Sequence, residues 1–276
     1  MQLLKRLNPI ALIALLMPSV LLAQSPCSAP SPDCVVVGEW DFSVSLGIGE
    51  RSNPIATGSD IPLVVIPQLS YYGKRFFIES LELGFTLYEG DAHTLNMIAT
   101  PGYDRVFFVR DDLQNYFVSG VGGAVSAPNT PELDEAINRP RHTTYLAGPE
   151  WLFDVGRITG QVSALYEATG RHKGFEVRAA LATPLIQSTH SLVLTGGLTW
   201  KSSQLVDYYY GFEGFYDADA ALSPFIKLGY SRALGERWSL NAFVHYEYLG
   251  DAIADSPIVV DESVTSAFIG VVFKVF

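Results

Sequence analysis

The chain has 276 residues, and charged residues make up only 17% of it, below the roughly 25% that is usual for soluble domains. Hydrophobic residues reach 48% and aromatic residues 12%, a balance that suits a surface partly facing lipid. The formal net charge of −11 argues against nucleic-acid binding, because phosphate contacts need Lys and Arg. It also disfavours peripheral docking on anionic lipid.

The N-terminus predicts export through a cleaved signal peptide over residues 1–23. Lys5 and Arg6 form a positive start, residues 10–22 are apolar, and Ala23 is a small residue suited to cleavage. The apolar stretch is shorter than the ~20 residues that a membrane-spanning helix needs, which disfavours an uncleaved anchor.

Residues 24–36 are predicted to form a periplasmic segment that contains both cysteines of the chain, Cys27 and Cys34. In an oxidising compartment such a pair is expected to form a disulfide. Two cysteines without nearby His fall short of a four-ligand metal set. We therefore expect a local disulfide here, and we expect no metal and no cofactor in the protein.

Residues 37–276 show the period-two alternation of half-buried strands. Between Trp238 and Tyr248, Leu240, Ala242 and Val244 alternate with Asn241, His245 and Glu247. Residues 40–48, 81–87, 158–166, 175–181 and 192–200 follow the same pattern. The predicted strands that contain these alternating runs are about 10 to 14 residues long, as tilted transmembrane strands require, whereas soluble strands average about five or six. The sequence predicts a transmembrane antiparallel β-barrel of about twelve strands, with both termini in the periplasm and the chain in the outer membrane of a Gram-negative bacterium.

The connections are predicted to alternate in length, as in bacterial barrels. Short turns are expected near residues 73–74, 101–102, 154–156, 184–189 and 233–237. Longer loops are expected at 50–60, 120–141, 201–222 and 250–263, with 89–92 and 169–173 as shorter members of that set. One strand is placed within 104–125, although this stretch lacks clear alternation. Aromatic residues at strand ends, including Trp40, Tyr71, Tyr72, Tyr88, Trp151, Trp200, Trp238 and Tyr248, predict two interfacial girdles.

The last predicted strand covers residues 266–276. Its aromatic end and alternating apolar residues are typical of the signal that the barrel-assembly machinery recognises. Phe268, Val272 and Phe276 are the candidate signal residues, and Lys274 interrupts the apolar series.

A Tyr-rich segment is the candidate loop contact surface. It contains Asp207, Tyr208, Tyr209, Tyr210, Gly211, Phe212, Phe215 and Tyr216. Tyr supplies a large amphipathic contact area at little entropy cost. The alternative, which we slightly favour, is an interfacial belt or a loop folded over the barrel mouth.

The sequence does not favour catalysis. A barrel lipase would need Ser and His close together, but His190 and Ser191 are adjacent strand residues that point to opposite faces. A surface protease could use Asp111, Asp112 and His142, or the stretch 171–173, yet charged loop residues are usually only solvated. His93 and His245 have no evident ligand partners for a metal. We expect no enzyme.

The predicted lumen residues are of mixed charge and polarity: Glu82, Gln161, Ser163, Arg178, Asn241 and Glu247. About twelve strands leave a narrow lumen that side chains can largely fill. Such residues either pair and close the interior or line a narrow passive channel for small solutes, and the sequence leaves both open.

Three blocks of the sequence resemble the MipA/OmpV family of outer-membrane proteins. They are Gly47–Pro54 with the run Pro67–Phe77, the motif Asp207–Gly211, and Tyr248–Ala252 with Asp255–Pro257. Their order and spacing match along nearly the whole mature chain. The ending Phe273-Lys274-Val275-Phe276 departs from the family by one aromatic position. The resemblance implies a structural or scaffolding role. The family's namesake binds the lytic transglycosylase MltA and a bifunctional penicillin-binding protein. Other members of the family act as surface adhesion or antigenic proteins.

We expect Cys27 and Cys34 to be bridged in the exported protein, which mass spectrometry of alkylated, non-reduced protein would detect. The bridged loop is short and precedes the first strand, so the bridge should contribute at most ~2–3 kcal/mol, confined to that segment. The double variant Cys27→Ser/Cys34→Ser should therefore keep the barrel's stability. Two alkylated thiols in non-reduced protein would contradict the pairing.

Overall fold

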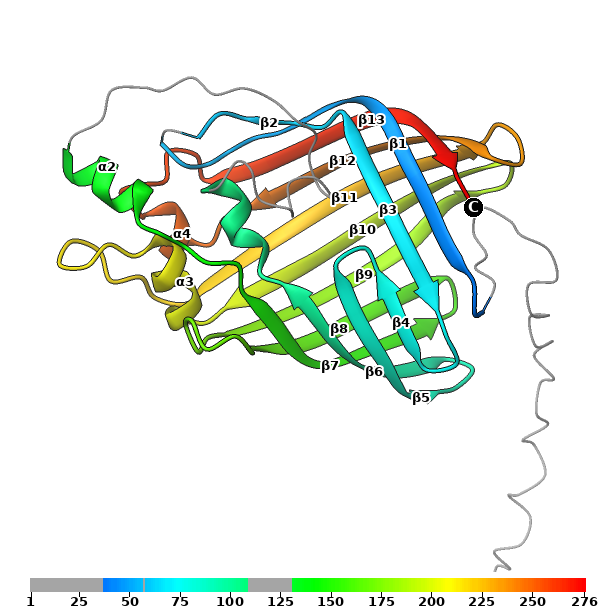
Figure 1. The fold of residues 1–276 in the computed structure, drawn as a ribbon, viewed down its shortest axis with the longest axis horizontal. Coiled ribbons are helices and arrows are strands. Elements are labelled where there is room, and N and C mark those ends of the chain that lie inside the picture. Colours follow the sequence, from blue (N-terminus) through cyan, green and yellow to red (C-terminus); the bar gives the residue numbers. More distant parts are fainter. Residues whose placement is uncertain (1–36, 57, 109–130) are drawn as a thin grey trace, which may run out of the picture.

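The computed structural model describes residues 37–56, 58–108 and 131–276, and they form one large β-barrel (Figure 1). The predicted signal peptide 1–23, the segment 24–36 with its two cysteines, and the pair Asp111 and Asp112 lie outside the described residues. The helices among the described residues are all too short or too polar to span a membrane.

The barrel consists of long antiparallel strands joined in chain order. They are β1 (Trp40–Arg51), β2 (Ile61–Pro62), β3 (Val65–Tyr72), β4 (Phe76–Glu79), β5 (Glu82–Glu89), β6 (His93–Pro101), β7 (Tyr145–Val155), β8 (Ile158–Glu167), β9 (Phe175–Gln187), β10 (His190–Lys201), β11 (Ala221–Ala233), β12 (Trp238–Tyr248) and β13 (Ser263–Lys274). The short β2 pairs only with β1, just ahead of β3, so the closed ring has 12 strands. This confirms the predicted fold class.

The first and last strands close the ring. β1 pairs with β13 from Ser43 opposite Lys274 to Arg51 opposite Ser266. The two strands approach closely: a Cβ atom at Gly47 would lie 2.2 Å from the Ile269 carbonyl oxygen, and one at Gly49 would lie 2.4 Å from that of Ala267. The seam therefore depends on glycine. Closure matters because an open sheet edge in lipid would leave backbone groups unpaired.

The start of β1 and the end of β13 lie at one end of the barrel, which we call the terminus end; the opposite end is the loop end (Figure 1). Tight turns at residues 73–75, 90–92, 156–157, 188–189 and 234–237 join strands at the terminus end. Segments 52–60, 102–144, 168–174, 202–220 and 249–262 join them at the loop end. The predicted alternation of short turns and longer loops is confirmed for most connections.

Three details of the predicted topology were wrong. Residues 76–89 are not one strand, because β4 and β5 form a hairpin whose turn has Ser80 at φ 55°. One strand was predicted within 104–125, but residues 103–107 form the 3-10 helix η1 (Tyr103–Phe107) and β6 pairs directly with β7; residues 109–125 lie outside the described residues. Consequently 101–102 begins a loop-end connection and 90–92 is a terminus-end turn. The β4–β5 hairpin adds a strand to the ring, and the ring has no strand between β6 and β7, which is why the predicted strand number agrees with the observed 12.

Inward and outward residues alternate along β12 as predicted. Val244 and Tyr246 are exposed on the outer wall, whereas Asn241, Phe243 and Glu247 line interior cavities. Exposed aromatics also gather towards the two ends, as the predicted girdles require. Trp40, Tyr88, Trp151 and Trp238 lie towards the terminus end, and Tyr166, Phe175, Trp200 and Tyr246 towards the loop end. Tyr71, Tyr72 and Tyr248 are only half-exposed.

Two of the three candidate assembly residues do not face lipid, as residues of such a signal usually do. Phe268 and Val272 point into the lumen, while Ile269 and Val271 are exposed on the outer wall. Phe276 follows the end of β13 and packs beside Phe42, with ring centroids 5.8 Å apart. In β13 the odd-numbered residues therefore face outward, which agrees with a C-terminal ending whose aromatic residue is shifted by one position. An assembly role for these residues stays a prediction.

The directions in which the β12 side chains point can be tested with a pair of variants, one on each face of the strand. Ala242→Arg would place a guanidinium against lipid and should destabilise the barrel by about 2–4 kcal/mol. Asn241→Arg should have a much smaller effect, because Asn241 lines a polar interior that can hydrate the charge. Urea unfolding in lipid vesicles measures both. Equal losses of stability would contradict the assigned faces.

Candidate functional site at the loop end

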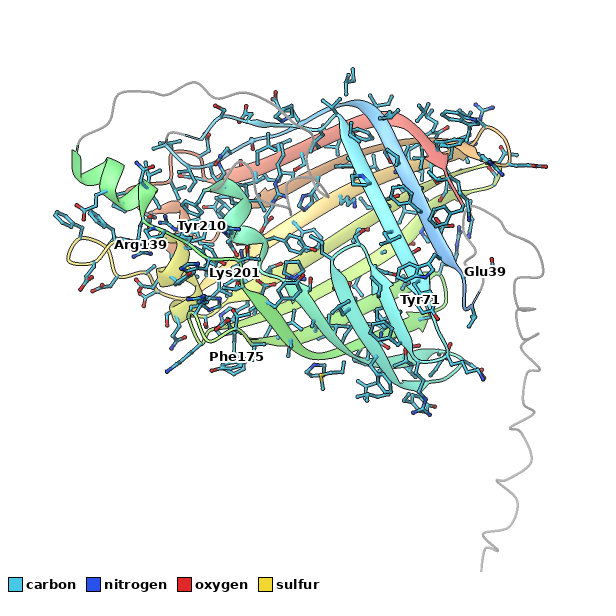
Figure 2. All side chains as sticks on the ribbon, viewed as in Figure 1. Glu39, Tyr71, Arg139, Phe175, Lys201 and Tyr210 are labelled. Carbon is cyan, nitrogen blue, oxygen red and sulfur yellow. The ribbon has the colours of Figure 1, made fainter. Side chains whose placement is uncertain are left out.

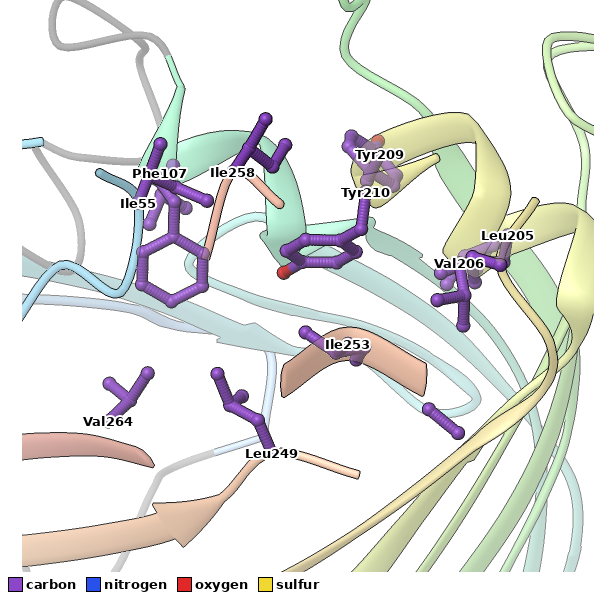
Figure 3. Packing of buried hydrophobic residues seen from close by; sticks show 14 of the residues in the cluster. Ile55, Phe107, Leu205, Val206, Tyr209, Tyr210, Leu249, Ile253, Ile258 and Val264 are labelled. Carbon is purple, nitrogen blue, oxygen red and sulfur yellow. The ribbon is translucent and has the colours of Figure 1, made fainter. Parts of the chain in front are cut away.

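The loop end is filled by chain segments that fold inward and pack on one another. η1, α3 (Ser203–Tyr210) and α4 (Asp251–Ala254), with Ile55, Leu249 and Ile258, form a unit that we call the loop plug. Its buried hydrophobic side chains come from four loop-end connections and meet across the barrel mouth (Figure 3). They include Ile55, Val106, Phe107, Leu205, Val206, Tyr209, Tyr210, Leu249, Ile253 and Ile258, and Val264 of β13 packs with them. The barrel therefore carries a small hydrophobic core at this mouth.

Helix α3 supplies the centre of the plug. Leu205, Val206, Tyr209 and Tyr210 repeat at helical spacing on one face and are all buried. The helix begins after Ser202, whose hydroxyl accepts a hydrogen bond from the Phe175 N–H at 2.9 Å. This contact ties the start of the helix to the barrel wall.

The buried tyrosines correct part of the candidate contact surface. Tyr209 and Tyr210 are 0% exposed, so neither can touch a partner. The Tyr210 hydroxyl donates to Asp104 at 2.7 Å, and the Tyr209 hydroxyl lies 3.0 Å from that of Thr144. Burial raises the pKa of both phenols, which keeps them neutral. The favoured alternative, a loop folded over the mouth, describes these two residues.

Beyond the helix, the same segment remains accessible. Phe215 is 71% exposed and stacks on Phe212 with ring centroids 4.8 Å apart. The half-buried Tyr216 donates its hydroxyl to the Ala252 carbonyl at 2.9 Å, which links the segment to α4. Asp207 accepts a hydrogen bond from the Ala218 N–H at 3.1 Å, and Tyr208 accepts one from the His142 N–H at 3.0 Å. A contact role stays open for Phe212 and Phe215.

Arg141 fastens the long connection after β6 to the plug. Its guanidinium donates to the carbonyls of Ala136, Ile137, Arg139 and Tyr209 at 2.9–3.1 Å. It also lies over the Phe108 ring, 3.9 Å from the centroid, a cation–π contact. Burial lowers the pKa of Arg141 to about 10, so the side chain is still charged at neutral pH. A lone loop arginine carries no sequence signal, and this residue was missed.

A layer of charged side chains lies directly beneath the plug. Lys201 pairs with Asp104 at 2.6 Å (Figure 2 labels Lys201 and Tyr210), and Arg178 pairs with Glu176. Burial alone would raise the pKa of Asp104, but the Lys201 charge and the hydrogen bonds from Lys201 and Tyr210 outweigh it and hold that pKa below its ordinary value. Asp104 is therefore ionised at neutral pH.

The charged layer encloses a cavity of about 290 Å³ between the plug and the barrel wall. It is lined by Arg51, Tyr103, Asp104, Phe107, Glu176, Arg178, Thr199, Lys201, Tyr210, Glu247 and Leu249. Arg178 and Glu247 were predicted to face the lumen, and both do. Asp104, Lys201 and Arg51 were missed, because Asp104 lies in an unpredicted helix and the other two end their strands.

The lumen continues towards the terminus end as two further cavities of about 350 Å³ and 480 Å³. They share the lining residues Gln68, Ser191, Ser231 and Asn241, so they are adjacent in the lumen. The other predicted lumen residues also lie inside the barrel: Gln161 donates to Glu150, Ser163 is buried, and Glu82 is half-buried.

The candidate catalytic residues that the structure describes lie at opposite ends of the barrel. His190 and Ser191 lie at the terminus end, where the His190 ring is 6.0 Å from that of Tyr230. His172 is buried beneath Tyr208 and accepts a hydrogen bond from the Gly174 N–H at 3.1 Å. His142 is exposed. Within the described residues, no three His, Cys, Asp or Glu side chains are grouped to hold a metal ion.

Comparison with known proteins finds a matching family, a relative and solved structures of similar chains. The family model described as "MltA-interacting protein MipA" matches residues 44–275. The chain is 23% identical over 228 residues to "Putative outer membrane protein YiaT" of Escherichia coli (strain K12), covering 79% of this chain and 85% of that protein. Among solved structures, the NanC porin aligns with a TM-score of 0.41 at 12% identity, covering 85% of this chain and all of that one. An anion-selective porin from Comamonas acidovorans aligns with a TM-score of 0.36 at 11% identity, covering 86% and 98%.

The closed ring of strands and the outer-membrane relatives define the class: this is an outer-membrane β-barrel protein with a folded plug at its loop end. Within that class, the chain belongs to the MipA family, as its resemblance predicted.

Because Lys201 and Asp104 are buried together beneath the plug, replacing one of them should destabilise the protein more than replacing both. Lys201→Met leaves the Asp104 carboxylate buried without its cation, and should destabilise the protein by about 3–5 kcal/mol. The double variant Lys201→Met/Asp104→Asn should lose much less. Lys274→Met is the matched control, because its partner Asp41 is partly exposed and such pairs contribute only about 0–1 kcal/mol.

Urea unfolding in lipid vesicles measures these differences. The folded-state pKa of Asp104 is depressed, so the pair's contribution is present above the ordinary carboxyl value of 3.8 and is lost as the pH falls below it. The effect of Lys201→Met should therefore shrink in strong acid. A double variant as unstable as Lys201→Met would refute the pairing argument.

Proposed function

We propose that this protein is a non-conducting outer-membrane scaffold that holds a murein-remodelling enzyme of the lytic transglycosylase class at the membrane. The observation that carries the proposal is the loop plug, whose hydrophobic core fills one mouth of the barrel. A barrel closed at one end offers no continuous path for water or solutes. The description of the matching family names an interaction with MltA, which supports such an enzyme as the partner.

The proposal includes an orientation, with the loops outside the cell and the terminus end in the periplasm. The tight turns at the terminus end support it, because bacterial barrels keep their short turns on the periplasmic side. That end carries exposed charged residues of both signs: Lys74, Arg75, Arg157, Arg232 and Arg237 beside Glu39, Glu89, Asp91, Asp154 and Glu236. Such rim charges can set the specificity and the rate of binding to a periplasmic partner of complementary charge pattern.

A narrow passive channel is the second candidate. It is favoured by the two adjacent cavities in the terminus-end half of the lumen, both lined by the polar residues Gln68, Ser191 and Asn241. In this alternative the plug would have to move aside for solutes to pass.

Planar-bilayer recordings separate the two candidates. The scaffold proposal expects no steady conductance from the wild-type protein. It expects frequent openings from Leu205→Asp/Tyr209→Asp, because two carboxylates cannot remain in the plug's hydrophobic core without partners. Steady wild-type conductance, unchanged in the variant, would favour the channel.

Binding is tested separately, with purified lytic transglycosylase and the detergent-solubilised barrel protein. Reversing two rim charges, in Arg157→Glu/Arg237→Glu, should weaken binding at least tenfold. Phe215→Ser at the loop tip is the matched control and should leave binding unchanged. The partner assignment fails if the enzyme does not bind, or if only the loop-tip variant loses binding.

A further inference from the structure

The cavity beneath the loop plug contains more charge than its ion pairs account for. Three cations line it, Arg51, Arg178 and Lys201, and so do three carboxylates, those of Asp104, Glu176 and Glu247. Lys201 is paired with Asp104, and Arg178 with Glu176. Arg51 and Glu247 remain, one at the loop end of β1 and the other near the end of β12.

Neither remaining group is satisfied by its neighbours. The Nε atom of Arg51 is buried and has no hydrogen-bond partner among the described residues. Its guanidinium lies over the Phe107 ring, 4.9 Å from the centroid, and makes no ion pair within the described part of the chain. The Glu247 carboxylate likewise has no hydrogen-bond or ion-pair partner in the ranges that the structure describes, although it lines the same cavity. The two opposite charges thus border the same cavity without touching.

We propose that this cavity binds a small zwitterion of the α-amino acid class, with its carboxylate on Arg51 and its ammonium group on Glu247. A guanidinium binds a carboxylate through two parallel hydrogen bonds, and a carboxylate accepts from an ammonium group. The cavity of about 290 Å³ lies at the small end of ligand sites. Phe107 and Leu249 provide an apolar wall for a short side chain.

The charge balance selects a zwitterion over a simple ion. Because the six lining charges sum to zero, a bound anion would leave Glu247 without a partner, and a bound cation would leave Arg51 without one. A buried polar group that loses water without gaining a partner costs free energy. A zwitterion satisfies both groups and keeps the cavity neutral.

The route to the site leads from the terminus end, since the plug covers the loop end. Along it, Phe243 lies opposite Phe268 on the neighbouring strand, with ring centroids 5.9 Å apart. The Lys227 ammonium lies 5.3 Å from the Phe243 ring centroid. Phe243, Phe268 and Lys227 line the next cavity of the lumen towards the terminus end, the side from which the ligand is proposed to enter. This inference does not depend on the scaffold proposal.

The test is equilibrium dialysis of the exported protein, folded in detergent, with radiolabelled L-alanine as the probe. Acetate and methylammonium serve as competitors that carry only one of the two charges. We expect one alanine per chain, and competitors at least tenfold weaker than alanine. No measurable binding of alanine, or binding no tighter than that of acetate or methylammonium, overturns the proposal.

Variants locate the site. Arg51→Gln and Glu247→Gln should each weaken alanine binding at least tenfold, and Arg51→Lys should fall between them and the wild type because it keeps the charge but loses the paired hydrogen bonds. Lys227→Gln is the matched control in the lumen and should leave binding unchanged. Unchanged binding in Glu247→Gln, or an equal loss in Lys227→Gln, contradicts the assignment. If a variant does not fold, the wild-type comparison of the three probes decides alone.

Discussion

In a lipid environment every unpaired backbone group at a sheet edge costs several kcal/mol, and the pairing of β13 with β1 removes that edge. The seam is formed by the close approach of Gly47 and Gly49 to the opposite strand. Once the ring is closed, side chains divide into an outer set in lipid and an inner set in the lumen. The exposed Val244 and Ile269 and the enclosed Asn241 and Phe268 follow from this single constraint.

Closure also explains why the interior is organised as it is. Charged residues inside a narrow barrel need partners, and Lys201 finds one only because η1 folds inward and brings Asp104 to it. Tyr210 joins the same carboxylate from α3, so two plug elements are tied to the wall by one buried group. Arg141 then holds the remaining connection to the carbonyls of the plug. The hydrophobic plug at this mouth supports the scaffold proposal, and the charges left over beneath it support the proposed zwitterion site.

The fold was predictable because alternation in strands such as β12 is a local property of the sequence. The hairpin at Ser80 was missed because its turn has neither Gly nor Pro and β4 has only 4 residues. The plug was only half predicted: the helical spacing of Leu205, Val206, Tyr209 and Tyr210 was a readable signal, but the aromatic run was read as a surface or a covering loop. Asp104 and Lys201 are far apart in sequence, and only the three-dimensional fold brings them together.

The most direct measurement of the central claim, that the lumen is closed at the loop end, is cysteine labelling in intact cells. In a Cys27→Ser/Cys34→Ser background, Asn241→Cys places a thiol in the lumen and Glu213→Cys places one on an exposed loop. A polymer-linked maleimide too large to cross the outer membrane should label Glu213→Cys at once. It should leave Asn241→Cys unmodified until the membrane is permeabilised. Labelling of Asn241→Cys at the same rate as Glu213→Cys in intact cells would contradict a closed mouth.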